Sequence, residues 1–462
     1  MTEVVPLVAE LRRRRIPSVV AQDILRREQA VADRPTSAVA EHNFAAGLGD
    51  AGFWKAAEQH VRAAFAKGGD APETWLVFAR ALVENGQWGE AEKAFRETLR
   101  RRPLYYDALR ELAQLRWMSG DDLRGSLADI DAALGAAPAD IVLQLMRAQI
   151  QDNAGEKAQA RESLLMLAKH NPGDPRILTA LAQITLELGE PDASLRLSET
   201  AYRLAPDSAV SAVAFASACF AVGASERALP AIERLRQSAP GNQHAIALEA
   251  TAWRLLGDPR YRALYDFDAF VAAFKLGVPA GWDTLDAYLR DLSAALEALH
   301  RAKAHPFNQS IKRGTQATSI LDSDAPALRA LPIALDTPIQ AYMQRLGAGP
   351  DPLRARNTGR HAIKGIWSIR MKSGGVHINH VHSEGWLSSA CYLSLPVDAP
   401  GKEGWIKFGE PGAPTRPPCP AEHFIQPHVG SIALFPSYMW HGTIPFSGDG
   451  VRMTFALDIV PD

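Results

Sequence analysis

A glycine returns at a nearly constant interval through the first half of the chain. Successive glycines are separated by 34, 35, 34, 34 and 34 residues, and they are Gly86, Gly120, Gly155, Gly189, Gly223 and Gly257. A proline follows each of the first five after 17 or 18 residues, at Pro103, Pro138, Pro172, Pro206 and Pro240. So short a unit cannot bury its apolar face alone, so this period predicts units that stack on one another in a solenoid.

Apolar residues between these marks recur at helical spacing, as in Ala91, Phe95 and Leu99. Each unit therefore predicts a helix, a tight glycine turn, a second helix and a proline that prevents continuation. The period and the segment Asn-Gly-Gln-Trp-Gly-Glu-Ala at 85–91 resemble the tetratricopeptide repeat. We expect five full repeats over roughly residues 70–240, a partial unit before them and a last helix that ends near Gly257.

The resemblance implies a superhelix with a concave surface. One interpretation is a groove that captures a peptide or a partner protein. The other is a scaffold that supports the neighbouring domain or mediates self-association.

The period disappears from about residue 260. Residues 259–304 keep a helical pattern, and short apolar runs bounded by Gly and Pro follow. These runs predict strands at 365–371, 387–395, 405–408, 431–435 and 453–460, which is typical of an antiparallel sandwich or barrel. The expected fold is multidomain α + β, with an all-α tetratricopeptide-repeat solenoid before a jelly roll, or double-stranded β-helix. The expected domains are a helical segment at 1–40, the solenoid at 41–258 and a C-terminal domain at 259–462, whose helical lead-in is 259–304.

Three histidines and an arginine stand out in the C-terminal domain. His380 and His382 are one residue apart, so on a strand their side chains would point to the same side. His441 comes just after a predicted strand, and Arg452 opens the last strand with Thr454 on the same face. Imidazoles suit Fe(II) and leave open positions for a chelating co-substrate and for O2. A guanidinium supplies a planar, permanently charged fork for a carboxylate.

The C-terminal part, about residues 300–462, resembles the Fe(II)- and 2-oxoglutarate-dependent oxygenases. The stretches that carry the resemblance are 305–316, 380–386, 435–441 and 452–454. In that family the first histidine of a His-X-Asp element and a distal histidine bind iron, and Arg-X-Ser/Thr binds 2-oxoglutarate. The resemblance assigns these roles to His380, His441, Arg452 and Thr454. It implies Fe(II), the co-substrate 2-oxoglutarate and O2.

This chain departs from the family at the carboxylate position, where His382 stands in place of aspartate. Either His382 is itself a ligand, which gives three imidazoles, or water completes a site with two protein ligands. A third register, His382-Ser383-Glu384, would restore a His-X-Glu element. Other candidates are Ser388 and Tyr392 for the co-substrate, and Trp386, Trp440 and Arg370 for the substrate pocket. Arg370 could equally pair with a nearby acid.

Composition narrows the classes of partner. The formal net charge is −2, which gives no reason to expect nucleic acid or an acidic membrane surface. No apolar run approaches the roughly 20 residues of a membrane span, and the N-terminus has no signal-peptide pattern. The three cysteines are far apart, which favours reduced thiols in the cytoplasm.

The sequence thus predicts a 2-oxoglutarate-dependent dioxygenase that hydroxylates a protein or peptide recruited by the repeats. Two alternatives remain open. One is a non-catalytic adaptor or sensor, and the other is an oxygenase that acts on a small or carrier-tethered molecule.

Overall fold

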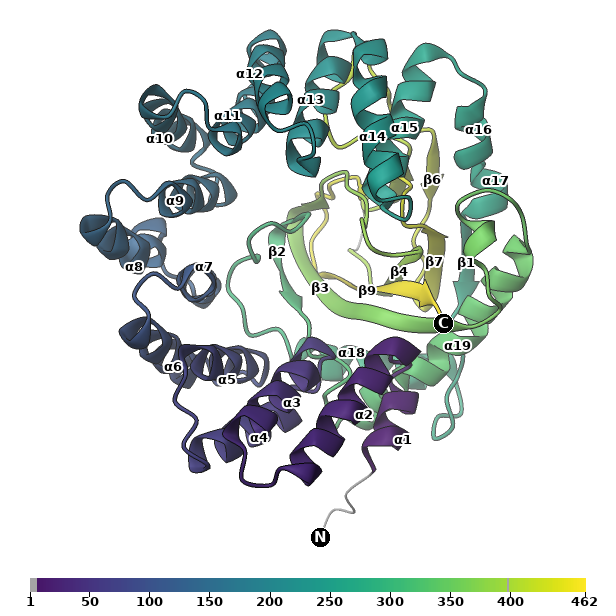
Figure 1. Ribbon diagram of the computed structural model, residues 1–462. Helices are drawn as coiled ribbons and strands as arrows, with labels where there is room; N and C mark the ends of the chain where they lie inside the picture. Colours follow the sequence, from purple (N-terminus) through teal and green to yellow (C-terminus); the bar gives the residue numbers. More distant parts are fainter. Residues whose placement is uncertain (1–5, 397–398) are drawn as a thin grey trace.

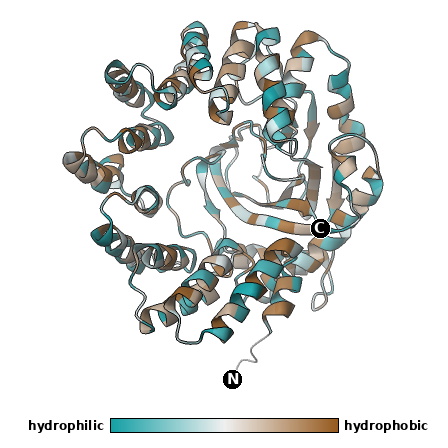
Figure 2. Ribbon diagram, viewed as in Figure 1, coloured by the Kyte–Doolittle hydropathy of each residue, from teal (hydrophilic) through white to brown (hydrophobic). Residues whose placement is uncertain are grey.

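The computed structural model describes residues 6–396 and 399–462, so residues 1–5 of the predicted N-terminal segment lie outside it. A ring of helices surrounds an antiparallel sheet (Figure 1). The β-rich domain therefore sits inside the solenoid rather than beyond its end. The helices of the ring carry both hydrophobic and hydrophilic residues (Figure 2).

The repeats form as predicted. Each turn glycine has a positive φ, between 69° and 100°, which is a backbone conformation that glycine adopts without strain. Ala91 and Phe95 are buried between the paired helices. The helices of the first half are α1 (Leu7–Arg13), α2 (Ser18–Asp33), α3 (Ala38–Asp50), α4 (Trp54–Ala66), α5 (Pro72–Glu84), α6 (Trp88–Arg101), α7 (Tyr106–Ser119), α8 (Leu123–Ala136), α9 (Ile141–Asn153), α10 (Lys157–His170), α11 (Pro175–Glu187), α12 (Pro191–Leu204), α13 (Ala209–Val222), η1 (Ser225–Ala228), α14 (Leu229–Ser238) and α15 (Gln243–Leu256). The domain boundary predicted between residues 40 and 41 would cut through helix α3.

The second half contains two antiparallel sheets. Six strands follow the order β1-β7-β4-β9-β3-β2, and three follow the order β6-β5-β8. The strands are β1 (Ala272–Lys275), β2 (Ile311–Ala317), β3 (His361–His377), β4 (Leu387–Ser394), β5 (Ile406–Phe408), β6 (His423–Ile425), β7 (Ser431–Pro436), β8 (His441–Thr443) and β9 (Arg452–Pro461). All five predicted strands are present. The α + β class is confirmed, whereas the double-stranded β-helix stays a prediction.

Two segments of this half differ from the sequence-based expectation. Residues 259–304 contain the short helices α16 (Arg260–Leu264) and α17 (Phe267–Phe270) and the helix α18 (Leu285–Glu297), but also β1, which pairs with β7. Residues 326–346 form the helix α19 (Pro326–Leu346) although Pro332 and Pro338 lie inside it. Burial of its apolar side chains against the domain core outweighs the missing hydrogen bonds. A 3-10 turn, η2 (Arg354–Arg356), follows.

The N-terminal helices close the ring onto the β-rich domain. The backbone N–H of Ile363 in β3 donates to the carbonyl of Arg15 at 2.8 Å. Arg14 is buried, pairs with Asp322 at 2.7 Å and lies 3.8 Å over the Phe53 ring. The solenoid is therefore held to the domain at both of its ends.

A segment of the same chain, residues 301–308, lies in the concave face of the solenoid. The N–H of Lys303 donates to the carbonyl of Met118 at 2.8 Å, and the indole of Trp117 donates to the carbonyl of His305 at 3.0 Å. Phe307 is buried among side chains of α7, α8 and α9. The N–H of Asn308 donates to Asn153 Oδ1 at 2.7 Å. These contacts confirm the scaffold interpretation for this part of the groove.

A second segment, residues 409–420, covers the last repeat helices. The N–H of Arg416 donates to the carbonyl of Phe220 at 2.8 Å, and Arg254 donates to the carbonyl of Gly409 at 2.7 Å. The repeats between the two covered regions, around Gly155 and Gly189, have open space beside their turn glycines.

None of the described helices combines the length and apolarity that a bilayer crossing requires. The three cysteines Cys219, Cys391 and Cys419 are unpaired.

Candidate metal centre

His380 and His441 lie opposite each other on an antiparallel β-bridge. The N–H of His380 donates to the carbonyl of His441 at 2.9 Å, and the reverse bond is 3.1 Å. Partners in such a bridge project their side chains to the same face, and the two imidazole centroids are 4.3 Å apart. Glycine at 442 permits this approach, because a Cβ there would lie 2.4 Å from Asn379 Oδ1.

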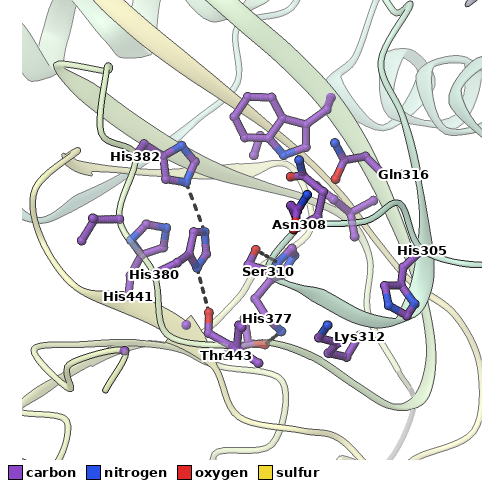
Figure 3. A pocket seen from close by; sticks show the side chains of 18 of the residues that line it. His305, Asn308, Ser310, Lys312, Gln316, His377, His380, His382, His441 and Thr443 are labelled. Carbon is purple, nitrogen blue, oxygen red and sulfur yellow. Dashed lines mark hydrogen bonds between the residues drawn. The ribbon is translucent and has the colours of Figure 1, made fainter. Parts of the chain in front are cut away.

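His382 joins this pair, as its two-residue spacing from His380 predicts. Its Nε2 lies 3.2 Å from Nε2 of His380. The ligand atoms of His380, His382 and His441 all lie within 4.8 Å of one another (Figure 3). The three residues could hold a metal ion.

The other ring nitrogen of each histidine is already engaged. Nδ1 of His380 is 2.8 Å from the carbonyl of Ile378, and Nδ1 of His441 is 2.9 Å from the carbonyl of Met439. Nδ1 of His382 is 2.6 Å from Asp458 Oδ1. Because these oxygens accept, each Nδ1 donates its proton, and in a neutral ring Nε2 then carries a lone pair.

Burial favours the neutral rings of His380 and His441. It lowers the pKa of His380 to about 3 and holds the pKa of His441 well below its usual range. If both rings are neutral and donate through Nδ1, the Nε2 lone pairs of His380 and His382 face each other across 3.2 Å, and a cation between them would stabilise both. Two nitrogens about 2.1 Å from one metal ion and at right angles to each other would be about 3 Å apart. The donor set therefore fits a metal ion.

Glu384 does not join the cluster, so the His-X-Glu register is wrong. Its carboxylate is 75% exposed and pairs with Lys364. Residue 384 lies two positions beyond His382 in a turn that leads away from the bridge. Within the described part of the chain, the group that could hold a metal here consists of the three histidines.

Arg452 lies in the same cavity as the histidines and is 2% exposed. Its Nε has no hydrogen-bond partner, its Nη1 makes a long contact of 4.0 Å with Met371 Sδ, and Arg452 makes no ion pair with any described residue. The hydroxyl of Tyr392 is also buried without a partner, and the guanidinium lies 5.6 Å from the centre of that ring. Burial lowers the pKa of Arg452, but a guanidinium stays charged at neutral pH. A buried cation without a counter-ion, beside an unused hydroxyl, fits an anionic ligand.

The cavity that contains these groups is large, about 1290 Å³. The histidines, Arg452 and Thr454 line it from the β-rich domain. Figure 3 shows that His305, Lys312 and Gln316 also lie around it. Across from them, Asp152, Asn153, Lys157 and Glu187 of the repeats line the same space. The cavity thus lies between the two domains.

Two of the predicted pocket residues lie elsewhere. Trp386 is fully buried, and its indole donates to the carbonyl of Leu353 at 2.8 Å. Trp440 turns toward α15 and donates to Thr251 Oγ1 at 2.9 Å. Neither tryptophan lines the large cavity: Trp386 serves packing, whereas Trp440 lines a smaller cavity, about 300 Å³, that also reaches His380. Trp367 of β3 lines the large cavity instead, with its ring stacked 5.6 Å from that of His382.

Two polar side chains that were predicted to bind substrate or co-substrate have other partners. Arg370 pairs with Glu297 of α18 at 2.8 Å, as the alternative interpretation expected. Ser388 is buried, and its hydroxyl donates to Asp458 Oδ1 at 3.0 Å rather than facing the cavity. Sequence reasoning missed Asp458 itself. The available signal was an acidic residue within the apolar run 455–460 of the last strand.

Comparison with known protein families agrees with the two-part organisation. Residues 365–458 match the family described as "Putative 2OG-Fe(II) oxygenase". Residues 76–141 and 145–209 match the tetratricopeptide repeat. The chain therefore contains segments that match each of these families, and the resemblance seen in the sequence is confirmed.

No curated protein matches the chain. Several solved structures resemble part of the chain. One, a tetratricopeptide-repeat protein of Thermus thermophilus, is 23% identical, with 39% of this chain and 98% of that chain covered and a TM-score of 0.30. For a repeat protein of Cytophaga hutchinsonii the identity is 14%, the coverage 50% and 94%, and the TM-score 0.35. For yeast Tom70 the identity is 13%, the coverage 58% and 61%, and the TM-score 0.42.

Proposed function

We propose that the protein is an Fe(II)- and 2-oxoglutarate-dependent dioxygenase that uses His380, His382 and His441 as metal ligands. One observation carries the proposal. Three imidazoles with converging Nε2 atoms share a cavity with the buried, unpaired guanidinium of Arg452. Three imidazoles at one face of an ion leave its other positions for a chelating keto acid and O2. The two antiparallel sheets around the site are compatible with the double-stranded β-helix that the resemblance implies.

Different residues of the site bind the metal ion and 2-oxoglutarate. The histidines hold the metal ion, and Arg452 holds the distal carboxylate of 2-oxoglutarate, with Thr454 and Tyr392 beside it. The bound iron with 2-oxoglutarate and O2 supplies the oxidising power for hydroxylation. The cavity leaves room for a substrate side chain near the histidines.

The uncovered part of the repeat groove supports a peptide or protein substrate. A second cavity, about 660 Å³, lies on α9, α11 and α13 and shares Asp152, Asn153, Glu187, Asn308 and Gly412 with the first. Its walls combine apolar side chains with amides, which suits an extended polypeptide. The residues that supply these walls include Leu145, Gln149, Gln183, Ile184 and Val213.

The same chain covers the neighbouring repeats but leaves this section open. Added Cβ atoms at Gly86, Gly120 and Gly223 would meet Arg301, Lys303 and Arg416 of the covering segments, whereas Gly155 and Gly189 face open space. A substrate can therefore enter between the segments 301–308 and 409–420 and reach the histidines. The unpaired cysteines are compatible with a cytoplasmic location.

A turnover assay with an array of short peptides tests both the oxygenase activity and the peptide substrate. The protein with Fe(II), 2-oxoglutarate and O2 should release succinate and add one oxygen atom to responsive peptides. We expect Val213→Arg to abolish peptide hydroxylation because Val213 lines the open groove. Val210→Arg, on the same helix with a 59% exposed side chain outside the groove lining, should retain it.

Two results would contradict the proposal. If 2-oxoglutarate does not bind to the metal-loaded protein, the oxygenase assignment is wrong. If only small molecules are hydroxylated and Val213→Arg leaves that reaction intact, the assignment of a peptide substrate is wrong.

A further inference from the structure

The three imidazoles differ in the acceptor to which Nδ1 donates its hydrogen bond. Nδ1 of His380 and of His441 each donate to a main-chain carbonyl two residues earlier in the chain. Nδ1 of His382 donates instead to a carboxylate, Asp458 Oδ1, at 2.6 Å. A charged acceptor makes a shorter and stronger hydrogen bond than a neutral carbonyl does.

The Asp458 carboxylate is itself held in place. Ser388 Oγ donates to Asp458 Oδ1 at 3.0 Å, and Ser437 Oγ lies 2.9 Å from Ser388 Oγ. Glycine at 385 leaves room for this network, because a Cβ there would lie 2.3 Å from Ser437 Oγ and 3.5 Å from Asp458 Oδ1. Strands β4 and β9 place Ser388 and Asp458 opposite each other in register. The network therefore fixes the carboxylate from a direction away from the cavity.

Asp458 has one basic partner among the described residues. That partner is His382, whereas Lys364 at the nearby bulge of β3 pairs with Glu384. A carboxylate that is mostly buried, oriented by a serine and directed at one imidazole has a geometry suited to setting the direction of that ring. His382 Nε2 consequently points toward His380 Nε2.

We infer that Asp458 is a positioning residue that supplies, through His382, the negative charge that the family's His-X-Asp element places directly on the metal ion. This inference rests on the proposed function, because it assumes that the three imidazoles bind a metal. It favours His382 as the third ligand over a site completed by water. It also explains why histidine at position 382 accompanies an acidic residue in the last strand. The carboxylate acts from behind the ligand, where it orients the ring and strengthens its electron donation to the metal.

The test compares Asp458→Asn with the parent protein, since asparagine keeps the shape and an acceptor oxygen but removes the charge. Co(II) affinity, measured by equilibrium dialysis, should fall by about 10- to 100-fold, the usual effect of losing such a partner. Asp449→Asn, an exposed acid in the loop before β9, should bind Co(II) like the parent.

Spectroscopy separates positioning from a loss of structure. In the Cu(II)-loaded protein, pulsed electron paramagnetic resonance detects the remote nitrogen of each bound imidazole, which here is Nδ1. Asp458→Asn should still show three imidazoles, with an altered quadrupole coupling for one of them. His382→Ala should show two. If Asp458→Asn folds poorly, Ser388→Ala provides the same comparison, because it only loosens the carboxylate, and its Co(II) affinity should fall less.

The outcomes separate the role of Asp458 from the proposed function. If the parent binds Co(II) and the Asn variant binds it equally well with unchanged nitrogen couplings, the role of Asp458 is wrong and the proposed function stands. If the parent binds no metal, the proposed function fails together with the inference.

Discussion

The main chains of His380 and His441 exchange two hydrogen bonds, of 2.9 and 3.1 Å, on a single β-bridge. This pairing joins residues that are 61 positions apart in the sequence. It fixes the distance between two metal-ligand candidates by backbone geometry rather than by side-chain flexibility. Glycine at 442 leaves room for Asn379 beside the bridge, because an added Cβ would lie 2.4 Å from Asn379 Oδ1.

Removing one imidazole should abolish tight metal binding. His441→Ala deletes a ligand atom and leaves the bridge intact, so we expect the affinity for Fe(II) or Co(II) to fall by more than about 100-fold. Metal content after anaerobic dialysis measures this. His428→Ala, an exposed histidine outside the cluster, is the control. Equal metal content in His441→Ala and the parent would rule out the ligand assignment.

Arg452 should separate co-substrate binding from metal binding. Arg452→Met removes the charge-assisted hydrogen bonds to a carboxylate, each of which contributes about 1.5–3 kcal/mol. The affinity of the metal-loaded protein for 2-oxoglutarate should therefore fall at least about 10-fold, while Co(II) binding is unchanged. Isothermal titration measures both affinities. Arg370→Met should bind 2-oxoglutarate normally, because Arg370 pairs with Glu297.

Arg452→Met should not destabilise the ligand-free protein. Arg452 buries a charge without an acidic partner, and methionine removes that desolvation cost at a similar volume. We expect a Tm equal to or above that of the parent. A large drop in Tm would mean that the guanidinium has a structural partner.

Phe307 should hold the β-rich domain in the solenoid. Its side chain is 4% exposed and lies among repeat residues that include Leu109 and Met146. Phe307→Ala should lower the free energy of unfolding by about 3–5 kcal/mol, which chemical denaturation would detect. The exposed Val429→Ala should change it by less than about 0.5 kcal/mol. Similar small effects for both variants would contradict the packing described for the covering segment.

His300 should make stability depend on pH. Burial lowers its pKa to about 4, and both ring nitrogens bond to hydroxyls, Nδ1 to Thr315 at 2.8 Å and Nε2 to Ser368 at 3.0 Å. The unfolded state, with a pKa near 6.5, then binds more protons than the folded state between about pH 6.5 and pH 4. Stability therefore falls as the pH falls through this window.

Comparison with a variant isolates this contribution from the other histidines. Between pH 7 and pH 5 the metal-free parent should lose about 2 kcal/mol more than His300→Gln does. Urea unfolding at the two pH values measures the difference. Parallel losses in both proteins would show that the pKa of His300 is not lowered in the folded protein.

The sequence predicts the local features best. The glycine period places the repeat turns, and the spacing of His380 and His382 places both rings on one side. Features that depend on distant pairing were missed. Strand β1 forms because residues 272–275 pair with β7, some 160 positions away, and Asp458 reaches His382 only through the register of β4 and β9.

Burial and packing explain the remaining differences. Trp386 and Trp440 stand beside the histidines in sequence, but their indoles turn to carbonyl and hydroxyl acceptors in the core. The path of residues 301–308 through the repeat groove has no local signal, because an extended segment takes its partners from another domain. The repeat resemblance predicted a groove, and packing decided which part of it stays open.

Anaerobic titration of the Fe(II)-loaded protein with 2-oxoglutarate tests whether the three histidines and Arg452 form an oxygenase site. We predict a weak visible charge-transfer band that grows to saturation in the parent and is absent in His441→Ala. If iron is bound by the parent and 2-oxoglutarate produces no band, the site is not that of a 2-oxoglutarate-dependent oxygenase.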